Sequence, residues 1–174
     1  RAVRDIDYGT FRWLELERLE IERLAASGIE CRPEEAANEI HIAGRRFDPL
    51  LGPIDTAESR SLKAAAEPGW WIVQFVGPVR DDWLWWLEKA GMDPAQYLPV
   101  NAYLVWWPGG ASVDRQRILS APFVRWAGPL TSELKRRQAR SRTEKANARF
   151  EALIRGPAEV EPTLLQLEAA GFRI

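Results

Sequence analysis

The 174-residue chain is poor in the residues that bind metals and form cross-links. It has one cysteine, Cys31, and one histidine, His41. A single cysteine excludes an intrachain disulfide, and two soft ligands are too few for a structural zinc site. We interpret Cys31 as a small, partly buried residue rather than a reactive thiol. The sequence therefore predicts no metal and no cofactor.

Long apolar runs and an excess of one charge are also lacking. No stretch of about 18 apolar residues occurs, so the sequence predicts no membrane span. Lys and Arg total 24 and Asp and Glu total 25, which predicts no general attraction to nucleic acid or to an anionic membrane. The chain begins at Arg1 without a charged-then-apolar signal segment, which favours a processed or excised piece.

Motifs of common catalytic sites are missing as well. No Gly-x-Ser-x-Gly elbow is present, and the single histidine lies in a short alternating stretch. The segment "PGGAS" (108–112) lacks the Lys-Ser/Thr pair of a phosphate-binding loop. The carboxylates fall at spacings typical of solvated helix faces. We therefore predict no catalytic residues and a chain that is not an enzyme.

The chain is rich in apolar residues, which make up 46% of the sequence and include nine tryptophans. Tryptophan in this number is typical of core and interface packing. Residues 1–55 are expected to form an N-terminal α/β unit, followed by a linker or helix over 56–68. Within the first unit the pattern predicts a strand at 11–16, a helix at 17–28 and strand candidates at "IECRP" (29–33) and "EIHIAG" (39–44).

The clearest unit spans residues 69–130. Its first strand ends at Gly77-Pro78, and Trp83, Leu87 and Ala90 then recur at helical spacing until Gly91. Because Trp85 lies about half a turn from Trp83, we expect Trp83 to face the core and Trp85 to lie on the opposite side. The expected elements are a strand at 70–76, a helix at 79–90, strands at 96–99 and 101–107, a helix at 112–121 and a strand at 123–128.

This order is the split βαβ or ferredoxin-like plan, in which two helices cover one face of a four-stranded antiparallel sheet. The fold class predicted for the chain is therefore α+β, with a ferredoxin-like βαββαβ module flanked by related α/β units. The plan leaves the second face of the sheet open.

Part of the sequence of this unit recurs near the end of the chain. "FEALIRGPAEVEPTLLQLEAAG" (150–171) repeats the strand, Gly-Pro and helix of "WWIVQFVGPVRDDWLWWLEKAG" (70–91), with one extra residue. A charged connector over 131–149 separates the two copies. We interpret residues 150–174 as the start of a second βα unit that is incomplete. A βα fragment buries its own apolar face poorly, so this unit is either cut short or completed by something else.

Several short sequence segments within residues 73–130 resemble the N-terminal prodomain-like region of bacterial subtilisin-like serine peptidases. "YGTFRWLEL" and "GRRFDPL" resemble the segment that precedes this region. The matching words are Val73-Gln74-Phe75, Gly77-Pro78, Trp83, Leu87, Gly91, Tyr97-Leu98-Pro99, Asn101-Ala102-Tyr103-Leu104-Val105 and Phe123-Val124-Arg125-Trp126.

The resemblance implies a docking module rather than a catalyst. Subtilase prodomains have a ferredoxin-like fold, pack a sheet on the peptidase, assist its folding and inhibit it. The implied partner is a subtilisin-like catalytic domain from the same precursor or an adjacent gene, and the implied location is secreted or cell envelope. The alternative is an accessory protein-interaction module without a peptidase. An RNA-binding domain is a third interpretation, but "NAYLVWWPG" does not match the RNP pattern.

Strand alternation predicts which side docks. Gln74 lies opposite Val73 and Phe75, and Arg125 lies opposite its two neighbours, so the polar side is expected to be the open one. We place Tyr103 and Val105 on that side. The predicted partner-docking residues are thus Gln74, Tyr103, Val105 and Arg125, and the alternative is a plain solvated sheet face.

Overall fold

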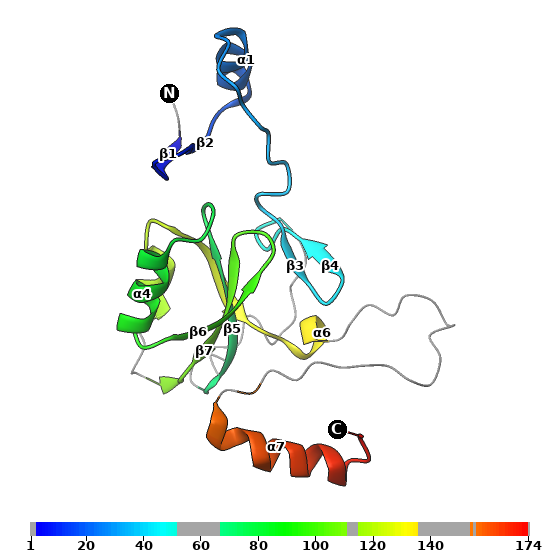
Figure 1. Ribbon diagram of the computed structural model, residues 1–174. Coiled ribbons are helices and arrows are strands. Elements are labelled where there is room, and N and C mark those ends of the chain that lie inside the picture. Colours follow the sequence, from blue (N-terminus) through cyan, green and yellow to red (C-terminus); the bar gives the residue numbers. More distant parts are fainter. Residues whose placement is uncertain (1–2, 52–66, 111–114, 136–153, 155, 174) are drawn as a thin grey trace, which may run out of the picture.

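A four-stranded antiparallel sheet forms the centre of the protein (Figure 1). The computed structural model describes residues 3–51, 67–110, 115–135, 154 and 156–173. The sheet has the strand order β6-β7-β5-β8. Helix α4 lies between β5 and β6 in the chain, a turn joins β6 to β7, and α5 lies between β7 and β8. The elements are β5 (Gly69–Phe75), α4 (Asp81–Lys89), β6 (Asp93–Leu98), β7 (Ala102–Trp107), α5 (Arg115–Ser120) and β8 (Val124–Pro129).

The remaining elements surround this sheet or stand apart from it. Two short antiparallel hairpins precede it in the chain, and two helices follow it. These elements are β1 (Arg4–Asp7), β2 (Arg12–Glu15), α1 (Arg18–Ala26), β3 (Ile40–Ile42), β4 (Arg45–Phe47), α6 (Ser132–Lys135) and α7 (Pro157–Ala169).

Local sequence explains why α4 begins and ends where it does. Asp81 and Asp82 occupy its first turn, where carboxylates interact favourably with the positive end of the helix dipole. Gly91 adopts φ of 90°, a left-handed conformation that glycine adopts with little strain. The backbone N–H of Met92 then donates to the carbonyl of Leu87 at 3.0 Å, which closes the helix end.

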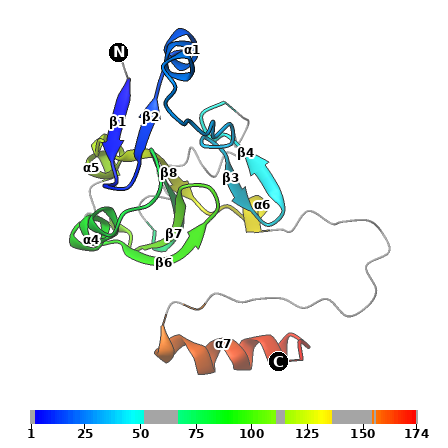
Figure 2. The same cartoon turned by 45° about the horizontal axis from the view of Figure 1, so that its top comes forward.

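Each face of the sheet has its own core. The helix-side core lies under α4 and α5 and includes Trp71, Val73, Phe75, Trp83, Leu87, Met92 and Val105. The hairpin-side core lies between the sheet and β3–β4 and includes Ile40, Ile72, Leu98, Ala102, Leu104 and Leu134. Figure 2 shows α4 and α5 on one side of the sheet and β3–β4 on the other. The expectation that the second face is open is therefore wrong.

The β1–β2 hairpin docks on the turn between β5 and α4. The indole N–H of Trp13 donates to the carbonyl of Val76 at 3.0 Å, and the hydroxyl of Tyr8 donates to the carbonyl of Pro78. A Cβ on Gly77 would lie 2.9 Å from the Trp13 ring, so this close approach requires glycine. The Gly-Pro turn is thus a packing site as well as a strand end.

Several sequence expectations can be compared with these elements. The predicted strands at 70–76, 101–107 and 123–128, the helix at 79–90 and the strands at 11–16 and 39–44 are confirmed within a few residues. No strand forms at 29–33, so that prediction is wrong. Of the linker or helix expected at 56–68, residues 56–66 lie outside the described residues. Most of the connector at 131–149 and most of residues 150–155 also lie outside them.

The two faces of α4 differ as expected, and this yields a test of stability. Trp83 is 7% exposed and stacks on Phe75 and Phe123, whereas Trp85 is 59% exposed. We predict that Trp83→Ala lowers the free energy of unfolding by about 3–5 kcal/mol. Trp85→Ala should lower it by less than about 0.5 kcal/mol. Urea denaturation of both variants measures the difference, and equal losses would contradict it.

Candidate functional site

Two of the four predicted docking residues meet on the hairpin-side face. Gln74 lies on β5 with its side chain fully buried, and Arg125 lies beside it on β8 at an irregularity in the strand register. The guanidinium Nη1 of Arg125 donates to Oε1 of Gln74 at 2.8 Å. Strand alternation thus placed these two side chains correctly relative to each other.

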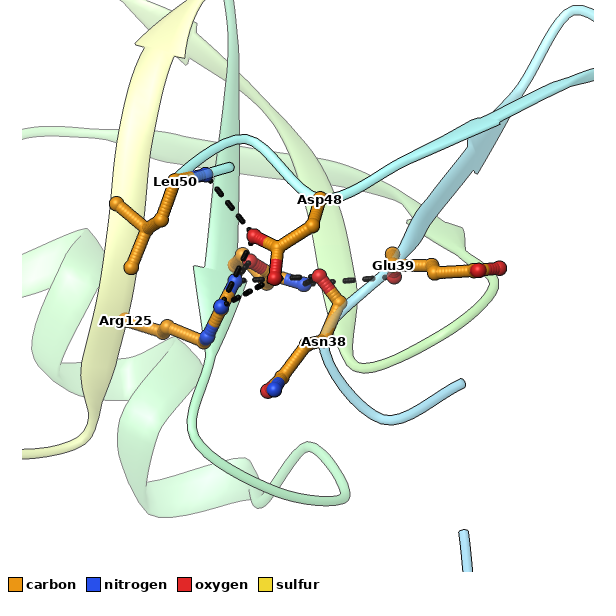
Figure 3. A network of polar contacts seen from close by, with 6 residues as sticks. Asn38, Glu39, Asp48, Leu50 and Arg125 are labelled. Carbon is orange, nitrogen blue, oxygen red and sulfur yellow. Dashed lines mark hydrogen bonds and ion pairs between the residues drawn. The ribbon is translucent and has the colours of Figure 1, made fainter. Parts of the chain in front are cut away.

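The pair does not face solvent, because residues 38–48 cover it (Figure 3). Nη2 of Arg125 donates to both carboxylate oxygens of Asp48, at 2.9 and 2.8 Å. Oδ1 of Asp48 also accepts the backbone N–H of Leu50 at 2.9 Å. Nη1 of Arg125 and Nε2 of Gln74 both donate to the carbonyl of Asn38, at 3.1 and 3.0 Å. We call this network, made of Gln74, Arg125, Asp48 and the backbone of residues 38, 39 and 50, the clamp.

The clamp satisfies polar groups that would otherwise be buried without partners. The side chains of Arg125 and Asp48 are 14% and 13% exposed, so both charges are largely removed from water. Burial of a charge is unfavourable unless a partner and hydrogen bonds compensate it, and here both are present. The expectation that Gln74 and Arg125 mark an open docking face is therefore wrong, since they hold the cover in place.

Tyr103 and Val105 lie on the opposite face. Val105 is buried in the helix-side core, and Tyr103 packs against that core and contacts Tyr97 edge to face at 6.1 Å. The structure does not bring them together with Gln74 and Arg125. The uniformly apolar sequence of β7 hides this, because both of its faces are buried and alternation carries no signal.

A different surface combines exposure with aromatic side chains. On the outer side of α4, the ammonium of Lys89 lies 5.3 Å from the centroid of the Trp85 ring. The guanidinium of Arg117, on α5, lies 5.5 Å from the centroid of the Trp86 ring. Trp86 is half-buried and meets Phe123 edge to face, so its ring is held in place. We call Trp85, Trp86, Lys89 and Arg117 the helix-side patch.

This patch has the composition of a protein-binding surface. Tryptophan and arginine are enriched among residues whose truncation weakens protein interfaces most. Phe123 and Arg117 contact the Trp86 ring, so Trp86 has little conformational freedom left to lose on binding. The sequence signalled Trp85 through its position opposite Trp83, but nothing in it signalled Arg117, which a separate helix brings in.

The other chemically reactive side chains are dispersed. Cys31 is exposed rather than partly buried, and Nε2 of His41 lies 3.0 Å from Oε2 of Glu39. Within the described residues no three His, Cys, Asp or Glu side chains gather in a way that could hold a metal ion. Burial raises the pKa of Tyr8, against the opposing charge of Arg80. No helix in the described part of the chain is long and apolar enough to cross a membrane.

Comparison with known proteins adds a family but no activity. A family described as a domain of unknown function (DUF8729) matches residues 41–131, which are 91 of the 174 residues. No curated protein and no solved structure matches the chain. The matched range begins in β3 and ends just before α6, so it contains the sheet together with the hairpin that covers it.

The clamp predicts a large loss of stability when one partner is removed. Asp48→Ala leaves the Arg125 charge buried without a counterion, and we expect the free energy of unfolding to fall by about 3–5 kcal/mol. Glu15→Ala is the matched control, because it removes an ion pair to Arg4 whose side chains are 37% and 56% exposed. It should change stability by less than about 1 kcal/mol. Denaturant titration tests both, and a mild effect of Asp48→Ala would show that the clamp is dispensable.

Proposed function

The chain belongs to the DUF8729 family, and we propose that it acts as a prodomain-type region of a subtilisin-like serine peptidase. In this role it docks on the catalytic domain, and it assists folding of that domain, inhibits it, or does both. In this proposal the catalytic groups belong to the partner domain. A secreted or cell-envelope location follows from the same proposal.

The arrangement of the central sheet supports this function and carries the proposal. The elements β5-α4-β6-β7-α5-β8 and the all-antiparallel strand order β6-β7-β5-β8 agree with the ferredoxin-like plan of subtilase prodomains. The sequence segments that resemble these prodomains lie at positions that build the fold. They include the buried residues Val73, Phe75 and Val124 and the Gly77-Pro78 turn. These segments support the fold of the module, but they do not identify the surface that contacts a partner.

The helix-side patch is the surface that we propose for docking. The opposite sheet face is held by the β3–β4 hairpin and the clamp, within the range that the family shares. Trp85 is the most exposed aromatic side chain of the central module, and Lys89 and Arg117 add two cations beside the indoles. Such a group fits a partner surface with an apolar pocket and a carboxylate rim.

Binding of purified components tests the proposal. We predict that the chain binds the subtilisin-like catalytic domain encoded in the same precursor or beside it and slows its hydrolysis of a peptide substrate. The double variant Trp85→Ala/Arg117→Glu should weaken binding at least about 10-fold, because it removes an aromatic anchor and reverses a charge. Calorimetry measures the affinity, and a chromogenic peptide measures inhibition.

Tyr97→Ala is the matched control, since Tyr97 is an aromatic side chain that is 50% exposed on the edge strand β6 and is not part of the helix-side patch. It should leave affinity unchanged. If the folded parent binds and the Trp85/Arg117 variant binds equally well, the helix-side patch is rejected. If the folded parent does not bind at all, the prodomain function is rejected and the accessory protein-interaction module remains.

A further inference from the structure

The β1–β2 hairpin is attached to the rest of the protein by little buried surface. Among residues 3–39, all of which the structure describes, no residue is buried. The two strands pair with each other and not with the central sheet, and Figure 2 shows them beside that sheet together with α1. The central sheet, in contrast, has fully buried residues on both of its faces. The contacts that hold the hairpin are therefore weaker than those that hold the sheet together.

Three consecutive residues of the central module receive the hairpin. The carbonyls of Val76 and Pro78 accept the indole N–H of Trp13 and the hydroxyl of Tyr8. Between these two acceptors Gly77 has no side chain, and a Cβ there would lie 2.9 Å from the Trp13 ring. The turn thus offers two hydrogen-bond acceptors and a flat surface for one indole.

Arg80 adds a cationic contact to the same place. Its Nη1 donates to the carbonyl of Asp7 at 3.0 Å, and its guanidinium carbon lies 5.7 Å from the centroid of the Tyr8 ring and 5.9 Å from that of Trp83. Nε of Arg80 also donates to Oδ1 of Asp82 at 2.9 Å. Because Asp82 belongs to α4, the guanidinium keeps an oriented partner within the module when the hairpin is absent.

We propose that residues 76–80 form a peptide-binding site and that the chain's own hairpin, residues 4–15, occupies it reversibly. The hairpin leaves and returns while the central sheet stays folded. An isolated two-stranded hairpin is marginally stable, so the β1–β2 ladder opens when it is undocked. Ile6 and Tyr8 pack against the helix-side core, so undocking exposes part of that core. This inference does not rest on the docking partner proposed above.

Hydrogen exchange of the full chain, followed by mass spectrometry, tests this proposal. In the parent, the amides of residues 4–15 should exchange at least about 100-fold faster than the slowest amides of β5 and β7, because the hairpin opens without global unfolding. Gly77→Ala should accelerate exchange of residues 4–15 at least about 10-fold further, since the added methyl group meets the Trp13 ring. It should change exchange of β5 and β7 by less than about 2-fold.

Gly69→Ala is the matched control for Gly77→Ala. Neither glycine has a positive φ, so alanine fits both backbones, and a Cβ on Gly69 meets nothing within 4 Å. Exchange of residues 4–15 should be unchanged in this control. If Gly77→Ala does not accelerate exchange of the hairpin, the site at residues 76–80 is rejected. If β5 and β7 lose protection together with the hairpin, the two form one cooperative unit and the reversible docking is rejected.

Trp13→Ala separates an effect on the site from an effect on the turn itself. It should accelerate exchange of the hairpin at least about 10-fold, as Gly77→Ala does. Adding Gly77→Ala to Trp13→Ala should accelerate exchange no further, because the methyl group then has no indole to meet. Independent, additive effects of the two changes would show that Gly77 does not act through Trp13, and they would overturn the proposal.

Discussion

The buried ion pair between Arg125 and Asp48 is the interaction on which the arrangement of the two sheets depends. Arg125 projects from β8 of the central sheet, and Asp48 follows β4 of the hairpin, so the pair joins segments 77 residues apart. Two buried charges would oppose folding if they met imperfectly. The other guanidinium nitrogen, Nη1, donates hydrogen bonds to Oε1 of Gln74 and to the carbonyl of Asn38, which fixes the orientation of the guanidinium group. Ile40 contributes buried apolar surface between the hairpin and the sheet, and the clamp fixes where the hairpin lies on the sheet.

This constraint changes which surfaces are available for function. A four-stranded sheet with helices on one face has a second face that can meet a partner, and here the chain fills that face with its own hairpin. The range that matches the family, residues 41–131, includes the sheet and most of the hairpin that covers it. The surfaces left exposed include the outer side of α4, where Trp85 is 59% exposed and Trp86 meets Phe123.

Sequence patterns predicted the central elements because their signals are local. The Gly77-Pro78 break, the acidic first turn of α4 and the spacing of Trp83 and Leu87 each involve residues within a few positions of one another. The clamp could not be predicted in this way, because Asp48 is unremarkable until the fold brings it to Arg125. A polar residue in a strand indicates solvent only if no distant partner reaches it, and Gln74 and Arg125 have such partners. Tyr103 and Val105 were misplaced because a strand buried on both faces loses its alternation.

The same distinction between local and distant causes applies to the sequence similarity between α4 and α7, in which residues 84–92 correspond to residues 164–172. In α4, the positions that are identical in α7 are mainly those that pack on the sheet or end the helix, and a few residue types meet these requirements. The outward positions obey no such requirement, and there Trp85 and Lys89 differ from Leu165 and Ala169. The aromatic and cationic side chains of the helix-side patch on α4 are thus not shared by α7, and packing on the sheet does not require them.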